Sequence, residues 1–374
     1  MPVILWTDAL IFLLLALALG FAWYAARHEH LRDPWRRVVR SRVGVAAMVV
    51  LAFYVVIGLL DSVHFHPPAK HAGPGDRAAY SGQILSLLDL WLTPLREQQE
   101  KTYSAPFATR LFAKELIELP DGRVVRDYPR LVWGGRHLQD PPSQRLPDIL
   151  AKAALGAVKG VAIWTLAAGL VVFALARHAG RPWRTTWSAA ARARTAVPWR
   201  TGLLTLGLML VLSAAASELA PHYHLLGTDK VGEDVFYQSL KSIRTGLVIG
   251  TLTTLVMLPA AIALGIMAGY FRGAIDDVIQ YLYTTLNSIP SVLLIAAAIL
   301  MLQIYMSAHE EQFNSLVERA DLRLLFLCII LGVTSWTSLC RLLRGESLKL
   351  REMDYVQAAR ALGVRHSRVI GRHI

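Results

Sequence analysis

Seven long runs of apolar residues constrain this chain more than any other feature of its sequence. A bilayer core takes about 20 apolar residues per helix, so runs of this length predict membrane-spanning helices. Lys159 is the one strong charge inside them, and it lies near enough to one end to reach the interface. We therefore predict an all-α polytopic membrane protein. The expected spans are Ala9–Ala26, Val43–Leu60, Ala153–Ala176, Thr201–Ser217, Gly246–Gly269, Val278–Ile304 and Leu324–Cys340.

Arginines gather in two of the connections between these spans. The first connection carries Arg27, Arg32, Arg36, Arg37, Arg40 and Arg42, and the third carries Arg177, Arg181, Arg184, Arg192, Arg194 and Arg200. Cytoplasmic loops hold an excess of such residues, so both connections should be cytoplasmic. The N-terminus, Asp61–Lys152 and Glu218–Thr245 then lie outside, and the chain from Arg341 onward is cytoplasmic. The net charge of +12 thus reflects membrane orientation rather than nucleic-acid binding.

The segment Asp61–Lys152 is too long and too polar to be a simple connection. Within it, Glu115–Leu119, Pro120–Gly122 and Arg123–Val125 are typical of a strand, a turn and a second strand. We expect a small extracytoplasmic α+β insertion.

Prolines interrupt two of the expected spans, at Pro259 and Pro290. A proline removes a backbone hydrogen bond and kinks a helix. The stretch Asn287-Ser288-Ile289-Pro290-Ser291 is also polar at membrane depth. Its polar groups either hydrogen-bond between helices or line a pathway at a kink, and the sequence favours neither.

The final stretch predicts a helix, a sharp turn and a second helix. One helix face carries Tyr355, Ala358, Ala359 and Leu362, with Gln357 and Arg360 off that face. Gly363 can take a positive φ and end the helix, and Ser367 can cap a second helix carrying Val369, Ile370 and Ile374. Such a face either lies on the anionic leaflet or docks into a groove on another protein.

Motifs of catalysis and metal binding are missing from the sequence. It has no phosphate-binding loop, no nucleophile elbow and no His-Glu-x-x-His helix, so we expect no enzyme and no nucleotide hydrolysis. Neither cysteines nor paired carboxylates accompany the histidines in a ligand pattern, and we expect no metal site. The histidines considered are His64, His66, His71, His222 and His224.

Gln357-Ala358-Ala359, followed after three residues by Gly363, resembles the EAA motif of ABC-importer permease subunits. Upstream, Leu226-Gly227-Thr228-Asp229 and Gly232-Glu233-Asp234-Val235 resemble the "LGTD..GRDV" segment of the dipeptide, oligopeptide and nickel branch, and Ile243–Leu247 resembles its "GAR.SL". The Asn287–Ser291 stretch resembles its "AFPS". Further matches are Trp336, Arg341, Arg344-Gly345-Glu346, Leu350-Arg351-Glu352 and Tyr355-Val356. Two positions depart from the motifs: Gln357 replaces the usual Glu, and Glu233 replaces the usual Arg.

The resemblance implies a multi-pass permease subunit of the bacterial inner membrane, in an ATP-driven importer of peptides or similar small solutes. The implied partners are ABC ATPase subunits that hold ATP and Mg, a second homologous permease subunit and an extracytoplasmic solute-binding protein. No cofactor is expected on this chain. The implied ATPase contacts are Tyr355, Gln357, Ala358, Ala359, Arg360, Leu362 and Gly363, and the implied family segment outside holds Gly227, Thr228, Asp229, Gly232 and Asp234. Asn287, Ser288 and Pro290 are the candidate pathway kink.

The expected domains are a two-helix membrane region at 1–60, the insertion at 61–152, a third helix with its basic loop at 153–200, and an incomplete permease core at 201–374 with the coupling stretch at 352–374. The last four spans resemble part of a six-helix core, after which the family carries a Leu-Pro pair and about two more spans. We therefore expect an N-terminal extension and a C-terminal truncation.

The insertion could contact a solute receptor, although we favour a cap on the membrane domain. The alternative function is a non-transporting membrane scaffold or sensor whose insertion binds a ligand.

Overall fold

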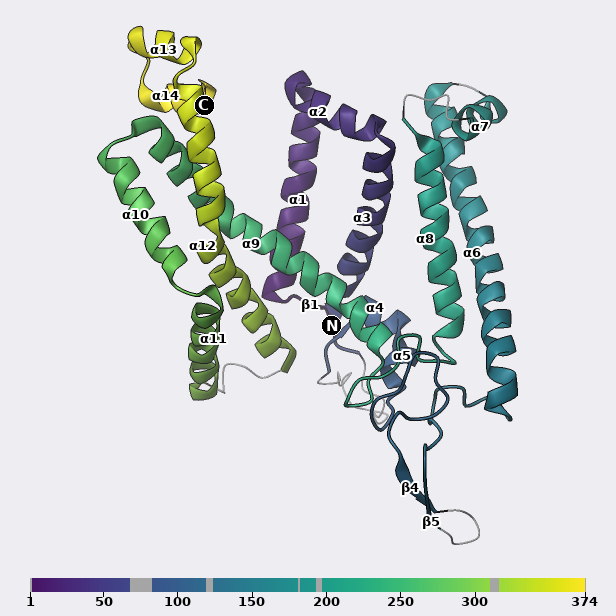
Figure 1. Cartoon of the computed structure of the whole chain (residues 1–374). Coiled ribbons are helices and arrows are strands. Elements are labelled where there is room, and N and C mark those ends of the chain that lie inside the picture. Colours follow the sequence, from purple (N-terminus) through teal and green to yellow (C-terminus); the bar gives the residue numbers. More distant parts are fainter. Residues whose placement is uncertain are drawn as a thin grey trace, which may run out of the picture. The chain divides into compact units, whose positions relative to one another are not determined.

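The structure is a computed structural model that describes residues 2–67, 83–118, 124–180, 182–192, 197–309 and 316–373. Most of these residues are helical (Figure 1). The helices are α1 (Trp6–Arg27), α2 (Glu29–Arg40), α3 (Arg42–Asp61), α4 (Leu87–Trp91), α5 (Thr93–Glu97), α6 (Pro141–Ala179), α7 (Trp183–Ala191), α8 (Trp199–Leu219), α9 (Val235–Phe271), α10 (Ala274–Ser288), α11 (Ser291–Ala308), α12 (Leu316–Arg351), α13 (Asp354–Ala361) and α14 (His366–His373). The strands are β1 (Pro2–Val3), β2 (His64–Phe65), β3 (Leu85–Ser86), β4 (Glu115–Glu118) and β5 (Val124–Asp127).

The described residues include seven helices that are long and apolar enough to cross a membrane, which confirms the predicted fold class. They are α1, α3, α6, α8, α9, α11 and α12. The sixth predicted span is wrong as a single helix, because Val278–Ile304 is divided between α10 and α11. Pro290 has no N–H to donate and disfavours helical geometry at the residue before it. Ile289 accordingly has an extended backbone, with φ −89° and ψ 124°.

The chain forms two compact units that interleave in the sequence. The N-terminal unit contains residues 17–65 and 85–244, and the C-terminal unit contains residues 1–16, 66–84 and 245–374. The domain boundaries expected from the sequence remain predictions.

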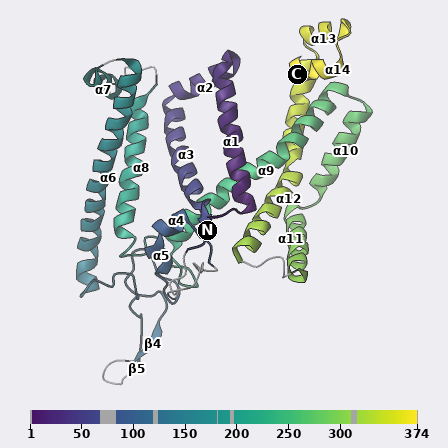
Figure 2. The same ribbon diagram turned by 180° about the vertical axis from the view of Figure 1, so that it is seen from behind.

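A long antiparallel hairpin of α6 and α8 dominates the N-terminal unit (Figures 1 and 2). Glycines bring the two helices close, because a Cβ added to Gly156 or Gly160 would lie 2.6 Å from the backbone of α8. The Trp164 indole N–H donates to the carbonyl of Leu203 at 2.7 Å. Lys159, the charge noted within the predicted span, forms an ion pair with Glu218. Small residues and interhelical hydrogen bonds of this kind stabilise helix pairs within membranes.

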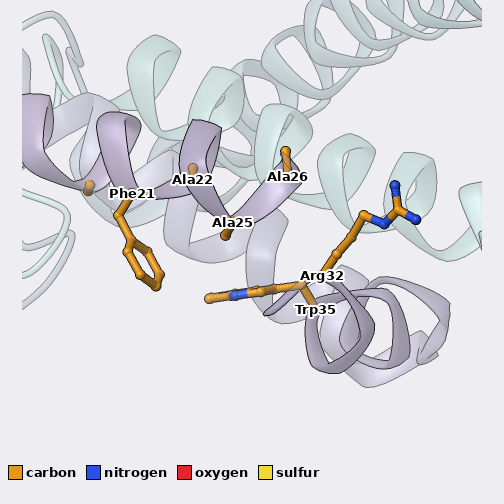
Figure 3. A pocket seen from close by; sticks show the side chains of 7 residues that line it. Phe21, Ala22, Ala25, Ala26, Arg32 and Trp35 are labelled. Carbon is orange, nitrogen blue, oxygen red and sulfur yellow. The ribbon is translucent and has the colours of Figure 1, made fainter. Parts of the chain in front are cut away.

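The insertion contains the predicted antiparallel strand pair. Strands β4 and β5 pair with Glu115 opposite Asp127 and Glu118 opposite Val124. The predicted turn at Pro120–Gly122, with Leu119 and Arg123 on either side, lies outside the described residues. An apolar cluster fastens the insertion to the ends of α3 and α8, where Leu88, Leu92 and Leu95 of the insertion pack with Ile57 and Ala220. In the same unit, a hollow lies between the end of α1 and α2 (Figure 3).

The C-terminal unit is built on the crossing of α9 and α12. Gly265 and Gly269 in α9 face α12, and a Cβ on either would lie within 2.8 Å of atoms of Cys340 and Leu343 or of Arg344 and Ser347. This spacing of small residues lets two helix backbones approach closely. Helix α9 continues without a break through Pro259, where a kink was predicted. The first half of α1 packs against α9 and α12 through Leu10, Ile11 and Leu14.

Candidate functional site

The C-terminal helix pair, α13 and α14, forms the helix–turn–helix that the sequence predicts. Gly363 has a φ of +75°, which only glycine adopts at little cost. Its N–H donates to the carbonyl of Arg360 at 3.0 Å, and the next N–H, of Val364, donates to Ala359 at 3.1 Å. These two bonds make a Schellman motif, which satisfies the last carbonyls of α13 and reverses the chain. Ser367 is not the predicted cap, because α14 begins one residue earlier, at His366.

A small apolar core holds this helix pair together and fastens it to the end of α9. Val356, Val369 and Tyr270 are buried in it, with relative exposures of 0%, 0% and 3%. The Tyr270 hydroxyl and His366 Nδ1 form a hydrogen bond of 2.7 Å. Arg272, just after α9, donates to the Glu352 carboxylate at 2.8 Å. The pair is therefore attached to α9 by apolar packing and by two polar contacts.

The outward side of α13 carries most of the predicted docking residues. Tyr355 is 50% exposed and Leu362 is 83% exposed, and Ala358 is also exposed. Ala359 differs from them, because it is half-buried against the core of the helix pair. An open groove beside this surface is lined by Gln357, Arg360, Ala361, Gly363, Val364, Arg365 and His366.

Gln357, at the position that departs from the EAA pattern, contacts Glu352. Its side-chain amide donates to the Glu352 backbone carbonyl at 3.3 Å and to the Glu352 carboxylate at 3.4 Å. A glutamate at 357 could not make these two contacts, because an ionised carboxylate accepts hydrogen bonds and does not donate them.

A bidentate ion pair joins α10 to the membrane-spanning helix α12. Arg344 of α12 donates to both carboxylate oxygens of Asp276 at the start of α10, each at 2.6 Å. This planar pairing is among the stronger ion-pair geometries. The Arg344 guanidinium lowers the pKa of Asp276, so the carboxyl stays ionised. Helices α10 and α12 are thereby held together close to the predicted coupling stretch.

At the candidate pathway kink, Asn287, Ser288 and Pro290 are all exposed, and Asn287 also hydrogen-bonds to another helix. Asn287 Oδ1 accepts from the Thr337 hydroxyl of α12 at 3.0 Å. Ser288 donates to the carbonyl of Thr285 in its own helix at 2.6 Å, and Pro290 precedes the first residue of α11. Asn287 therefore hydrogen-bonds between helices, which is one of the two roles considered for this stretch. The other role, lining a pathway, stays a prediction.

The second family segment, residues 226–235, is a tightly bonded turn that leads into α9. Gly227 and Gly232 have φ values of +79° and +81°. A Cβ on Gly227 would lie 2.2 Å from the carbonyl oxygen of Ser104, and one on Gly232 would lie 1.8 Å from that of Glu100. The backbone thus approaches the insertion at two points where any side chain would collide.

The polar residues of the segment satisfy its backbone. Asp229 Oδ1 accepts the N–H groups of Val231 and Glu233, each at 2.9 Å. Asp234 Oδ1 accepts the N–H groups of Phe236 and Tyr237 at 2.8 and 3.0 Å, which caps the start of α9. The Thr228 hydroxyl donates to the carbonyl of Thr102, in the insertion, at 2.8 Å.

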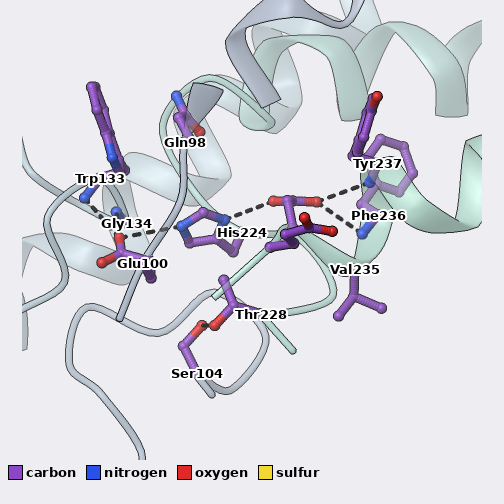
Figure 4. Close-up of polar contacts among 12 residues, drawn as sticks. Gln98, Glu100, Ser104, Trp133, Gly134, His224, Thr228, Val235, Phe236 and Tyr237 are labelled. Carbon is purple, nitrogen blue, oxygen red and sulfur yellow. Dashed lines mark hydrogen bonds and ion pairs between the residues drawn. The ribbon is translucent and has the colours of Figure 1, made fainter. Parts of the chain in front are cut away.

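A buried imidazole connects this segment to the insertion (Figure 4). His224 Nδ1 lies 2.7 Å from Asp234 Oδ2, and His224 Nε2 lies 3.3 Å from Glu100 Oε1. Glu100 also accepts the N–H groups of Val132, Trp133 and Gly134 at 2.8, 2.7 and 3.2 Å. All three charged side chains are at most 1% exposed.

The charges of this cluster support one another. Burial opposes the imidazolium, yet the hydrogen bonds to Asp234 and Glu100 raise the pKa of His224 to about 9. Burial likewise opposes the Glu100 carboxylate, but the bonds from His224 and three backbone N–H groups lower its pKa. His224 is thus a cation paired with two carboxylates at neutral pH. His71, another of the histidines considered from the sequence, lies outside the described residues.

Sequence reasoning missed Tyr270, Glu100 and the structural role of His224. Tyr270 ends an apolar run, and Glu100 lies in a polar stretch without a motif. Their partners are 96 and 124 residues away in the chain, so no local spacing identifies them.

The part of the chain that contains α13 and α14 is similar to a known protein family. Residues 261–374 match the family model described as the binding-protein-dependent transport system inner membrane component. This segment is similar to members of that family. Members of this family are inner-membrane components of transport systems. The seven candidate spans of this chain agree with such a location.

Three relatives show how far the likeness extends. The oligopeptide transport system permease protein OppC of Mycobacterium bovis is 29% identical over 151 residues, which are 40% of this chain and 46% of the relative. The glutathione transport system permease protein GsiD of Pectobacterium atrosepticum is 26% identical, covering 52% and 63%. The dipeptide transport system permease protein DppC of Bacillus subtilis is 24% identical, covering 46% and 53%. The chain thus spans about half the length of these relatives, and the predicted resemblance is confirmed.

Proposed function

We propose that this chain is a permease subunit of an ATP-driven importer for peptides or similar small solutes. The proposal rests on the family match of residues 261–374 and on relatives that are named as oligopeptide, glutathione and dipeptide permeases. The expected partners are ATPase subunits, a second permease subunit and an extracytoplasmic solute-binding protein. The chain itself contributes the membrane path and the contact with the ATPase.

The exposed surface of α13 supports the proposed contact with the ATPase. Tyr355, Ala358 and Leu362 are apolar, exposed and close together in the sequence, next to an open groove. An exposed apolar helix face can dock into a groove on a partner. Tyr355 is the aromatic anchor, and interface energy concentrates in such residues.

The attachment of the helix pair supports its role in transmitting a conformational change. Val356 and Val369 pack under Tyr270, Arg272 binds Glu352, and Arg344 binds Asp276. A packed core does not deform continuously, so a pull on α13 moves the connected helices as a body. Closure of two ATPase subunits would shift α9, α10 and α12 and switch the path between outward and inward access.

The test of the docking face is an Ala358→Asp exchange in the assembled transporter. A charge buried without a partner costs about 3–5 kcal/mol, which is enough to abolish co-purification of the ATPase subunits. Ser367→Asp is the matched control, because it adds the same charge to an exposed position of α14 that does not line the groove. Full ATPase recovery and full solute uptake with Ala358→Asp would overturn the proposed contact.

A further inference from the structure

A hollow between the end of α1 and the amphipathic helix α2 has the chemistry of a lipid site. Its floor is a stripe of small residues on α1, and α2 contributes one aromatic and one cationic side chain. The volume is about 400 Å³. The lining residues are Ala18, Phe21, Ala22, Ala25, Ala26, Arg32 and Trp35. We propose that this hollow binds one anionic phospholipid, with an acyl chain along α1 and the phosphate at Arg32.

The apolar part of the hollow suits a hydrocarbon chain. Phe21 and Trp35 are 54% and 56% exposed, and they stand on the same side of the alanines (Figure 3). The small side chains of Ala18, Ala22 and Ala25 leave room between them along the surface of a membrane span. An acyl chain placed there would cover exposed aromatic surface without displacing any side chain.

The polar part of the hollow is the Arg32 guanidinium, on a side chain that is 37% exposed. Arg32 Nε is shielded from solvent and has no hydrogen-bond partner in the part of the chain that the structure describes. The only ion pair of this guanidinium among the described residues is a long one, 3.7 Å to Glu29, on the same helix. Buried donors ordinarily find acceptors, and phosphate oxygens match the planar guanidinium well.

The surroundings favour an anionic lipid over other occupants. Helix α2 has Leu31, Trp35 and Val38 along one side and Arg36, Arg37 and Arg40 along the other, the pattern of a helix lying in a membrane interface. Trp23 and Tyr24 end the neighbouring span as an interfacial aromatic pair, and Arg27 stacks on Trp23 at 3.7 Å. Six arginines against two acids between residues 27 and 42 add attraction for a negatively charged leaflet.

The test is native mass spectrometry of the purified full chain with dioleoyl phosphatidylglycerol or dioleoyl phosphatidylcholine. The wild type should retain phosphatidylglycerol over phosphatidylcholine. Arg32→Gln should reduce phosphatidylglycerol retention by about tenfold, because one charge-assisted contact is lost. Ala22→Phe, which fills the hollow from an exposed position, should reduce retention of both lipids. Helical circular dichroism identifies any variant that has failed to fold.

Arg36→Gln is the matched control, since Arg36 is on the same helix, is not among the lining residues and pairs with Asp33. It makes the same change in charge and should leave retention within about twofold of the wild type. Equal losses of phosphatidylglycerol retention in Arg32→Gln and Arg36→Gln would show that only the overall charge of α2 matters. That result would overturn the proposed site. Equal retention of the two lipids by the wild type would overturn it as well.

Discussion

At the scale of single residues, Gly232 is where the family segment and the insertion meet most closely. Its φ is +81°, and an added Cβ would lie 1.8 Å from the Glu100 carbonyl oxygen. We expect Gly232→Ala to destabilise the N-terminal unit by more than the roughly 1–2 kcal/mol that positive φ alone costs an alanine. Thermal unfolding of the purified chain measures the loss.

The control is Gly180→Ala, which separates the stability lost through positive φ from the stability lost through a close backbone contact. Gly180 has a φ of +61° but nothing within 4 Å of its added Cβ. An equal loss of stability in the two variants would show that the close approach at Gly232 is unimportant.

The charged cluster at His224 predicts a dependence of stability on pH. Its pKa is raised from 6.5 to about 9, so the imidazolium stabilises the folded state fully below the unfolded value. That contribution declines as the pH rises above 6.5 and is gone above about 9. We expect the stability of the wild type to decrease across this pH range. In His224→Gln the decrease should be smaller.

The control for this pH dependence is His309→Gln, which removes an exposed histidine at the end of α11. Its melting temperature against pH should follow the wild type. A wild-type slope that persists in His224→Gln would assign the alkaline loss to another group.

At the scale of elements, the two sides of α13 should behave differently when they are truncated. Val356 is buried under Tyr270, whereas Tyr355 is 50% exposed. Val356→Ala opens a cavity in the helix pair at a cost of about 1–3 kcal/mol and should speed hydrogen exchange across residues 354–373. Tyr355→Ala should leave exchange unchanged and weaken recovery of the ATPase. The same response from both variants would contradict the assignment of one side to folding and the other to docking.

Elements with a strong local signal could be predicted from the sequence, and contacts between distant residues could not. The apolar runs locate seven spans because a bilayer demands length and hydropathy, and Gly363 marks the turn because its backbone needs a positive φ. The break at Pro290 was expected only as a kink, since proline disfavours a helix without stating whether a new one begins. The partners Tyr270–His366 and His224–Glu100 depend on packing over long sequence separations, which leaves no local pattern.

At the scale of the whole molecule, orientation in the membrane is still a prediction from the arginine-rich connections. It connects both main proposals, because the helix pair must face the ATPase and the α1–α2 hollow must face the cytoplasmic leaflet. Single cysteines in a background with Cys328→Ala and Cys340→Ala would test it. Phe112 in the insertion and Leu362 beside α13 are 75% and 83% exposed, so burial hides neither position.

We expect Phe112→Cys to react with a membrane-impermeant thiol reagent in intact cells, and Leu362→Cys to react only after the membrane is opened. The cysteine-free background is the control for other reactive proteins and should not label in either condition. The two positions are expected on opposite sides, so their labelling patterns must differ. If Leu362→Cys labels in intact cells and Phe112→Cys only after opening, the arginine count has the orientation reversed. The helix pair would then face away from the compartment that supplies ATP, and the proposed coupling would fail with it.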